Sequence, residues 1–255
     1  MIHEDRRRAS TFGEDARQYD RARPTYPADL IDHLMAENPQ RVIDVGCGTG
    51  IAARLFAERA CDVLGVEPDA RMAEVARGHG LDVEVATFEE WDARGRLFDL
   101  LISGQAWHWV NPEVGAHKAA DVLRPDGHLA VFWNFGTHGP EAKAALVAAY
   151  ERVAPELARE SYALGQPLAD DTAELRALRA SGRFDPIDVV TFAWERRYSK
   201  DEWLDQLPTH SDHRLLPERQ RAALLIEVGN AIDGLGGSVR VNYSTKLIAG
   251  VRLAD

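Results

Sequence analysis

A glycine-rich segment between a strand pattern and a helix pattern is well suited to hold a ligand. It has the sequence DVGCGTG, from Asp44 to Gly50. Glycine tolerates positive φ and lets a ligand touch the main chain. The third glycine comes one residue earlier than in the dinucleotide pattern, and the Lys-Ser/Thr pair of a phosphate-binding P-loop is missing. Because Asp44 precedes the first glycine, its charge opposes a pyrophosphate and suits a ligand that carries ammonium and sulfonium groups.

A second acidic residue, Glu67, ends the next strand pattern in the run VLGVEPD. A carboxylate at this place can accept hydrogen bonds from both hydroxyls of a ribose. Its distance from the glycine segment is about that found in dinucleotide-binding folds. The glycine segment, Asp44 and Glu67 follow one another in strand–helix–strand order, so together they predict a nucleoside-binding site.

Short apolar strands alternate with helical patterns in the first half of the chain. We expect strands at 41–45, 62–66, 81–85, 97–103 and 128–134, helices at 50–59, 70–78 and 112–123, and a turn at 124–127. Such alternation predicts a parallel sheet with helices on both faces. Right-handed crossovers then bring the carboxyl ends of the strands to one edge, where ligands bind.

The second half of the chain has a different pattern. We expect helical structure at 140–180, a strand at 188–198, helices at 199–207 and 217–233, and a last strand at 239–253. The fold class is therefore α/β: a Rossmann-like, seven-stranded, mostly parallel sheet with one antiparallel strand and a small helical cap. We expect a single domain, in which residues 1–30 form a lid, 31–136 the binding core, and 137–255 the cap and the last two strands.

Composition narrows the partners of the protein. A formal net charge of −11 over 255 residues disfavours nucleic acid, and no apolar run is long enough to cross a membrane. The N-terminal segment lacks the apolar stretch of a signal peptide. Two cysteines, Cys47 and Cys61, make neither a disulfide framework nor a zinc site. We expect a cytoplasmic monomer or homodimer that acts on a small molecule and needs no metal.

Several segments of the sequence resemble those of a known protein family. The runs VIDVGCGTG, VLGVEPD, FDLLIS and VLRPDGHLAVFWN resemble the class I methyltransferases that depend on S-adenosylmethionine (SAM). The runs FGEDARQYDRARPTYP, SGQAWHWV and YSKDEWLDQLPTHS resemble a small-molecule branch that includes trans-aconitate methyltransferase-like enzymes. The resemblance covers nearly the whole chain and implies SAM as cofactor and S-adenosylhomocysteine as product.

The resemblance also implies roles for residues at matching positions. Asp44 would hold the ammonium group of SAM, Glu67 the ribose, and Arg23 the carboxylate. Thr87 stands where many relatives have Asp, so the adenine contact falls either to its side chain or to the backbone of Phe88. The remaining residues expected around the cofactor are Tyr19, Gly46, Cys47, Gly48, Gly50, Pro68, Met72, Ser103 and Gln105.

The run QAWHWV after the fourth strand is expected to face the methyl group. His108 is the candidate general base, because methyl transfer needs a nucleophile free of its proton. The alternative is a structural His108 beside tryptophans of the core. The substrate wall is expected from Trp107, His108, Trp109, Trp133 and Phe135.

The predicted function is transfer of a methyl group to a small molecule, with an oxygen of a carboxylate or hydroxyl as the first choice of methyl-receiving atom and nitrogen or carbon left open. A SAM-binding protein without catalytic activity is the alternative. The early third glycine and Asp44 disfavour a nicotinamide dehydrogenase. His210-Ser211-Asp212-His213 is expected to be the end of a helix without a metal, since zinc needs three or four ligands.

Overall fold

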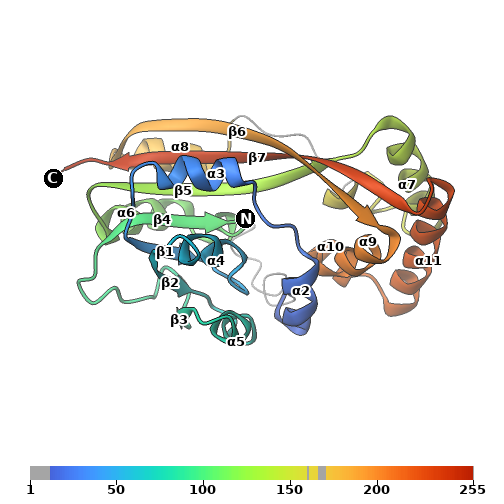
Figure 1. The fold of residues 1–255 in the computed structure, drawn as a ribbon, viewed down its shortest axis with the longest axis horizontal. Coiled ribbons are helices and arrows are strands. Elements are labelled where there is room, and N and C mark those ends of the chain that lie inside the picture. The colour runs from blue at the N-terminus through green and yellow to red at the C-terminus, as the bar shows by residue number, and fades with distance from the viewer. Residues whose placement is uncertain (1–11, 160, 166–170, 255) are drawn as a thin grey trace.

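The protein folds around one sheet, as shown by a computed structural model that describes residues 12–159, 161–165 and 171–254. The sheet has seven strands in the order β3-β2-β1-β4-β5-β7-β6 (Figure 1). Their bounds are β1 Arg41–Val45, β2 Asp62–Val66, β3 Asp82–Glu84, β4 Phe98–Gly104, β5 Leu123–Thr137, β6 Phe184–Ser199 and β7 Ser238–Arg252. The four neighbouring pairs from β3 to β5 are parallel. Within the described strands, β7 alone runs against its neighbours β5 and β6, which confirms the predicted fold class.

Helices cover both faces of this sheet. One face is packed by α3 (Ala28–Met35), α4 (Ile51–Ala57) and α5 (Ala70–Gly78), and the other by α6 (Pro112–Val122) and α8 (Ala173–Ser181) (Figure 1). The central strand β1 shows why both faces need cover: Val42 packs toward the first group of helices and Ile43 toward the second, and neither is exposed. A parallel strand buried on both sides is an almost continuous apolar run.

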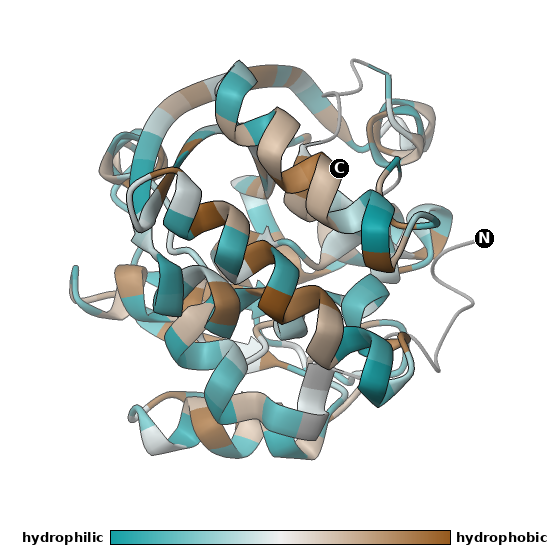
Figure 2. Cartoon of the chain, turned by 90° about the vertical axis from the view of Figure 1, so that its right-hand side faces the viewer, coloured by the Kyte–Doolittle hydropathy of each residue, from teal (hydrophilic) through white to brown (hydrophobic). Residues whose placement is uncertain are grey.

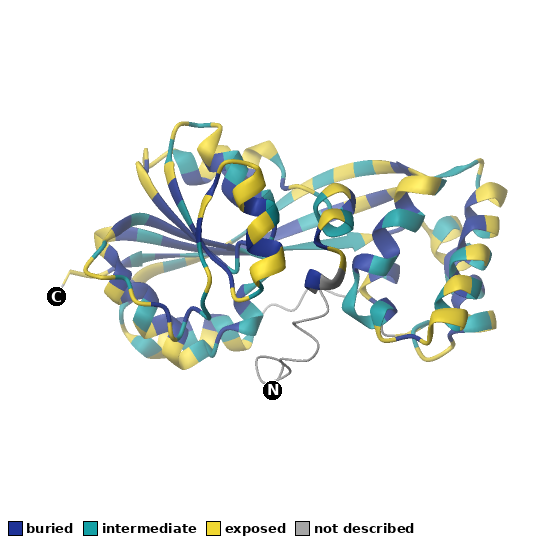
Figure 3. Ribbon diagram, turned by 90° about the horizontal axis from the view of Figure 1, so that it is seen from below, coloured by how far each residue is buried: buried dark blue, intermediate teal, exposed yellow. Residues whose placement is uncertain are grey.

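The three strands β5, β6 and β7 extend past the rest of the sheet and carry a second group of helices. These are α7 (Pro140–Val153), α9 (Lys200–Gln206), α10 (Ser211–Arg214) and α11 (Glu218–Gly234), which we call the cap lobe (Figure 1). The lobe has its own buried cluster, which includes Tyr150, Trp203 and Leu224. Buried residues accordingly form two groups, one along the sheet and one between the lobe helices (Figure 3). Hydrophobic and hydrophilic residues alternate along those helices (Figure 2).

Two predicted elements differ from the structure. The turn expected at 124–127 lies inside β5, where Phe98 pairs with Leu123 and Leu100 with His128. The intervening residues therefore form a bulge, with Asp126 at φ 61°. The helical stretch expected at 140–180 is interrupted, because α7 ends at Val153. Pro155 follows two residues later and disfavours helical geometry at the residue before it.

The other predicted elements lie within a few residues of their expected bounds. Short turns of 3-10 helix, η2 (Phe12–Asp15), η3 (Trp107–Trp109), η4 (Tyr162–Leu164) and η5 (Leu207–Thr209), join the longer elements. A further helix, α2 (Ala16–Ala22), precedes the sheet. In the part of the chain that the structure describes, no helix is both long and apolar enough to span a bilayer.

Candidate functional site

A cavity of about 860 Å³ lies at the carboxyl edge of the sheet and is lined by the sheet loops, by α2 and by the cap lobe. Most of the residues predicted to bind a ligand reach it. They are Tyr19, Arg23, Asp44, Gly46, Cys47, Gly48, Glu67, Pro68, Met72, Thr87, Phe88, Gln105, His108, Trp109, Trp133 and Phe135. Segments far apart in the sequence thus share one chamber.

The glycine segment turns sharply between β1 and α4. Gly46 has φ 68°, and a Cβ there would lie 2.5 Å from the Cβ of Ala106. Gly50 has φ 85°, and a Cβ there would lie 2.3 Å from Leu81. Glycine is needed at both positions, although Gly50 is packed behind the wall and does not line the cavity. Cys47 lines it, and burial raises the pKa of its thiol well above the usual range. This is the environment of a packing residue, not of a nucleophile.

Asp44, the penultimate residue of β1, lines the cavity with its carboxyl group. It is 1% exposed, and neither of its oxygens has a hydrogen-bond partner among the residues described. Burial, and secondarily the charge of Glu67, raise its pKa to about 8. A buried carboxylate is costly unless a charge or a hydrogen-bond donor meets it. Asp44 is therefore arranged to receive a cationic or hydrogen-bond-donating group from a ligand.

Glu67 follows β2 and joins two loops of the site. Its Oε2 accepts a hydrogen bond from the backbone N–H of Gly48 at 2.9 Å, and its Oε1 accepts one from Asp69 at 2.9 Å. Burial raises its pKa to about 7 despite these two bonds. Each carboxylate oxygen has a second lone pair, so ribose hydroxyls can still bind. Glu67 thus shapes the glycine segment as well as facing the cavity.

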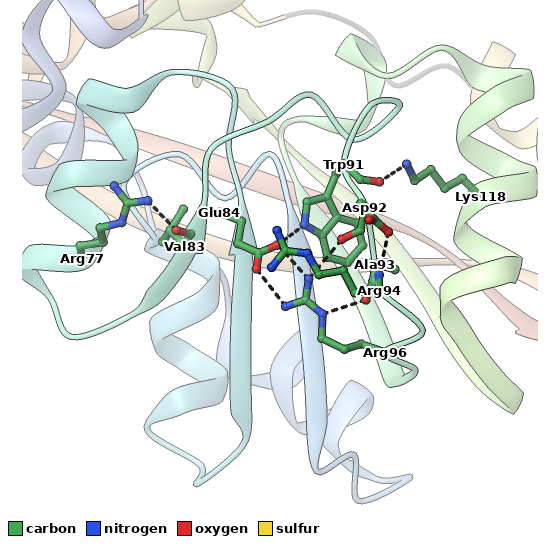
Figure 4. Close-up of polar contacts among 9 residues, drawn as sticks. All are labelled: Arg77, Val83, Glu84, Trp91, Asp92, Ala93, Arg94, Arg96 and Lys118. Carbon is green, nitrogen blue, oxygen red and sulfur yellow. Dashed lines mark hydrogen bonds and ion pairs between the residues drawn. The ribbon is translucent and has the colours of Figure 1, made fainter.

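The loop between β3 and β4 supplies Thr87 and Phe88 to the cavity, and a polar network braces it (Figure 4). Glu84 accepts two hydrogen bonds from Arg96, at 3.0 and 2.8 Å, and another from the indole of Trp91. Lys118 on α6 donates to the carbonyl of Trp91 from the other side. Phe88, 3% exposed, is consequently held in place as a cavity wall. The Thr87 hydroxyl donates to Glu90, which leaves the backbone of Phe88 for ligand contacts.

His108, in η3, is held by a tryptophan from the neighbouring strand. The indole N–H of Trp133 donates to His108 Nδ1 at 3.0 Å. Since an indole N–H only donates, His108 Nδ1 must be unprotonated, and the neutral ring carries its proton on Nε2. In this tautomer the ring presents a donor, which does not favour the predicted role of general base.

Two other predicted residues lie behind the cavity wall. Trp107 is 1% exposed and packs against Phe88 with ring centroids 5.8 Å apart, so it belongs to the core and not to the substrate wall. Ser103 is fully buried and donates to the carbonyl of Val45 at 2.7 Å, where it ties β4 to β1. Both residues support the chamber without facing it.

Helix α2 connects the sheet loops to the cap lobe. Asp20 accepts from Arg54 of α4 at 2.9 Å. On the other side of the helix, Arg21 makes a two-pronged ion pair with Asp205 of α9, at 2.8 Å for each contact. Arg23, just after α2, lies 3.3 Å from the ring nitrogens of His210. The described part of the predicted lid, from residue 12 on, therefore bridges both halves of the chamber, whereas residues 1–11 lie outside the described chain.

Sequence reasoning missed the residues that the cap lobe adds to the cavity. These include Trp203, Gln206, His210 and Asp212; Tyr243 and Lys246 reach the cavity from β7, and Tyr26 reaches it from the loop between α2 and α3. Only Lys246 could have been found from the sequence, because a charged residue stands there within an apolar strand. In the structure its side chain is 2% exposed. The His210–His213 segment was interpreted as a helix end, and it does begin α10. Within the described residues no group of three or more His, Cys, Asp or Glu is placed to hold a metal.

Comparison with known proteins accords with this geometry. Residues 43–131 match the model of a methyltransferase domain. An uncharacterised methyltransferase of Mycobacterium tuberculosis is 39% identical over 127 residues, which are 49% of this chain and 52% of the relative. Trans-aconitate 2-methyltransferase of Pseudomonas paraeruginosa is 34% identical over 118 residues, or 44% of this chain and 42% of the relative.

The matches to these curated relatives span about half of their length. A solved structure accounts for more of the chain. A putative type II methyltransferase from Anaeromyxobacter dehalogenans superposes with a TM-score of 0.69 and 25% identity, covering 91% of this chain and 99% of that one. The cap lobe therefore belongs to a fold already seen in a methyltransferase, and the predicted Rossmann-like class I fold is confirmed.

Proposed function

We propose that this protein is a SAM-dependent methyltransferase acting on a small molecule. The observation that carries the proposal is Asp44: a buried carboxyl at the methyltransferase-domain cavity, without a partner among the described residues. The α-ammonium group of SAM would supply the missing charge, and Glu67 would accept hydrogen bonds from the ribose. Ligand cavities commonly measure roughly 300–1,000 Å³. At about 860 Å³ this one lies near the upper end, which suits a cofactor together with a substrate.

The proposed methyl-receiving atom is an oxygen of a carboxylate or hydroxyl, and the tautomer of His108 favours a carboxylate. SAM supplies an electrophilic methyl group when bound. A carboxylate is ionised at neutral pH and needs no base, whereas a hydroxyl must lose its proton. His108 with its proton on Nε2 would donate a hydrogen bond that orients the carboxylate. Trp133 would be the residue that fixes this orientation. Two free cysteines are compatible with the cytoplasmic setting proposed from sequence.

The proposal is tested by titrating SAM and NAD into the purified protein in a calorimeter, followed by a turnover assay with labelled SAM. We expect SAM but not NAD to bind, and S-adenosylhomocysteine to accumulate with one or more members of a panel of small carboxylic acids and phenols. Tight SAM binding without product from any of them would favour a non-catalytic SAM-binding protein. Binding of NAD in place of SAM would refute the proposal.

A further inference from the structure

The cap-lobe side of the cavity contains a polar group that the proposed chemistry does not use. Gln206, the last residue of α9, and Asp212, in the first turn of α10, both line the cavity. They lie on the wall contributed by the cap lobe, away from the Asp44–Glu67 pair that would hold the cofactor. Gln206 is 3% exposed, so its amide is almost wholly withdrawn from bulk water.

Asp212 is held in one orientation by a chain of buried hydrogen bonds. Its Oδ1 accepts from both the backbone N–H and the ring Nδ1 of His213, at 2.8 and 2.7 Å. With the ring proton on Nδ1, His213 Nε2 accepts from the hydroxyl of Tyr150 at 2.7 Å. Tyr150 and His213 are essentially unexposed. This chain engages Oδ1 of Asp212, and the neighbouring hydroxyl of Ser161 also lowers the pKa of this carboxyl group.

Two acceptor oxygens at this wall lack hydrogen-bond partners among the described residues: Oδ2 of Asp212 and Oε1 of Gln206. Both are buried, so leaving them unpaired is unfavourable. Although burial opposes ionisation of Asp212, the hydrogen bond from His213 lowers its pKa below the usual range, and Asp212 is therefore an anion at neutral pH. His210 beside it is held neutral, because burial, and then the charge of Arg23, lower its pKa well below the usual range.

Asp212 offers an anionic acceptor and Gln206 a neutral one, and neither oxygen has a donor among the described residues. The two acceptors together fit a ligand group that carries N–H or O–H donors. We propose that Asp212 and Gln206 form a substrate subsite, which we call the cap subsite, that binds a hydroxyl or protonated amino group on the methyl-receiving molecule. The inference rests on the proposed function and extends it to a substrate class. The substrate is a small carboxylic acid that also carries a hydroxyl or amino group. His213 and Tyr150 are positioning residues, since they act only through Asp212.

The test uses the full chain and three acids of matching carbon skeleton: succinate, malate and aspartate. Their kcat/KM values are measured with labelled SAM, and their binding to the protein loaded with S-adenosylhomocysteine is measured by calorimetry. We expect malate or aspartate to exceed succinate by at least tenfold in one or both measurements. Preference for malate identifies a hydroxyl as the bound group, and preference for aspartate identifies an ammonium group.

Two variants test the assignment of this preference. Asp212→Asn keeps an oxygen for His213, and Gln206→Met keeps the volume of the side chain. Each is expected to reduce the preference to within about threefold by weakening only the substituted acid, with SAM affinity changed less than twofold. Asp201→Asn, an exposed change on the same helix α9, is the matched control and should keep the wild-type preference.

The melting temperature distinguishes a binding role of Gln206 from a purely structural one, because loss of a structural residue would lower it. Because Gln206→Met removes an unpaired buried oxygen, its melting temperature should equal or exceed that of the wild type. Equal treatment of all three acids by the wild type, or equal loss for all three in the variants, would overturn the cap subsite. Absence of turnover with intact, substituent-dependent binding would refute the proposed function alone. Absence of substituent-dependent binding would overturn the cap subsite whatever the turnover.

Discussion

Two carboxyl groups line the same cavity, that of Asp44 from the sheet and that of Asp212 from the cap lobe, and their pKa values are shifted in opposite directions. On the sheet side, burial, and secondarily the charge of Glu67, raise the pKa of Asp44 to about 8. On the cap side, the side chain of Asp212 is 13% exposed, and the hydrogen bond from His213 overcomes the cost of its partial burial and lowers its pKa below the usual range. Burial alone does not decide the charge of an acid; the donors around it do.

The difference separates two kinds of ligand recognition. With a pKa raised to about 8, Asp44 is largely protonated near neutral pH, so the proposed binding of an ammonium group there would release a proton. Asp212 keeps its charge with or without a ligand and offers a constant negative potential. The first arrangement suits a cofactor that carries its own ammonium group. The second suits discrimination between substrates by the donors that they carry.

The largest expected effect is on the pH dependence of stability. Asp44 and Glu67 have folded pKa values, about 8 and about 7, above their unfolded values. The folded protein without ligand therefore holds more protons than the unfolded chain, and its free energy of unfolding falls as pH rises toward those values. Each group contributes up to about 1.4 kcal/mol per pH unit. Urea unfolding of the ligand-free protein should lose about 3 kcal/mol or more between pH 5 and pH 7.

Asp44→Asn separates the two contributions to the slope of unfolding free energy against pH, since it removes one of the two titrating acids. If the stability of the ligand-free wild type stayed constant or rose between pH 5 and pH 7, the raised pKa of Asp44 would be contradicted. Asp212 affects stability at lower pH. Its lowered pKa contributes stability that is present above about pH 4, the usual pKa of Asp, and lost as pH falls further.

Asp44→Asn should also weaken SAM binding by about thirtyfold, or about 2 kcal/mol, because a charge-assisted hydrogen bond is lost. The stability of the ligand-free protein at pH 8 should be equal or greater, since a buried charge is removed. Calorimetry and thermal melting measure the two effects. Asp62→Asn, at the exposed start of β2, is the control and should leave SAM affinity unchanged. Unaltered SAM affinity in Asp44→Asn would remove this residue from the cofactor site.

Glu67→Ala is expected to weaken SAM binding by at least tenfold, about 1.4 kcal/mol. Unlike Asp44→Asn, it should also lower the melting temperature, because the N–H groups of Gly48 and Asp69 lose their acceptor. The two measurements together distinguish a residue that both shapes the site and binds from one that only binds. A Glu67→Ala protein with wild-type SAM affinity would show that the ribose is held elsewhere.

The smallest effect is expected at the contact that joins helix α2 to the cap lobe. Arg21→Gln removes the ion pair between α2 and Asp205, in which the arginine side chain is 58% exposed. Exposed ion pairs contribute little, so SAM affinity should fall by no more than about threefold. A double-mutant cycle with Asp205→Asn, read out as SAM affinity at low and high salt, isolates the pair. A tenfold coupling would mean that α2 controls access to the chamber.

Sequence patterns were enough to expect the sheet-side residues at one edge, where they do line the cavity, because the segments that hold them are local. In a parallel pair the register is regular: Asp44 lies opposite Gly65 and Val45 opposite Val66, so the residues that follow β1 and β2 meet at one edge. Pattern reasoning failed at Trp107 because a tryptophan in a short turn can point either way. Here it points into the core against Phe88. The interpretation of Asp212 as part of a helix end was incomplete for a similar reason.

The sequence by itself determined that a turn of glycines and two acids, Asp44 and Glu67, would meet at the carboxyl edge of β1 and β2. Chain geometry over some twenty residues is enough for that, since strand, turn and helix follow directly from the residues that form them. Only the tertiary structure decided which residues line the opposite wall of the cavity. Gln206, Asp212 and Lys246 reach the cavity because β5 and β7 pair antiparallel from His128 to Thr137 and carry the cap lobe beyond the sheet. Such contacts depend on packing between distant segments, and of these three residues only Lys246, a charge within an apolar strand, is marked by the sequence pattern.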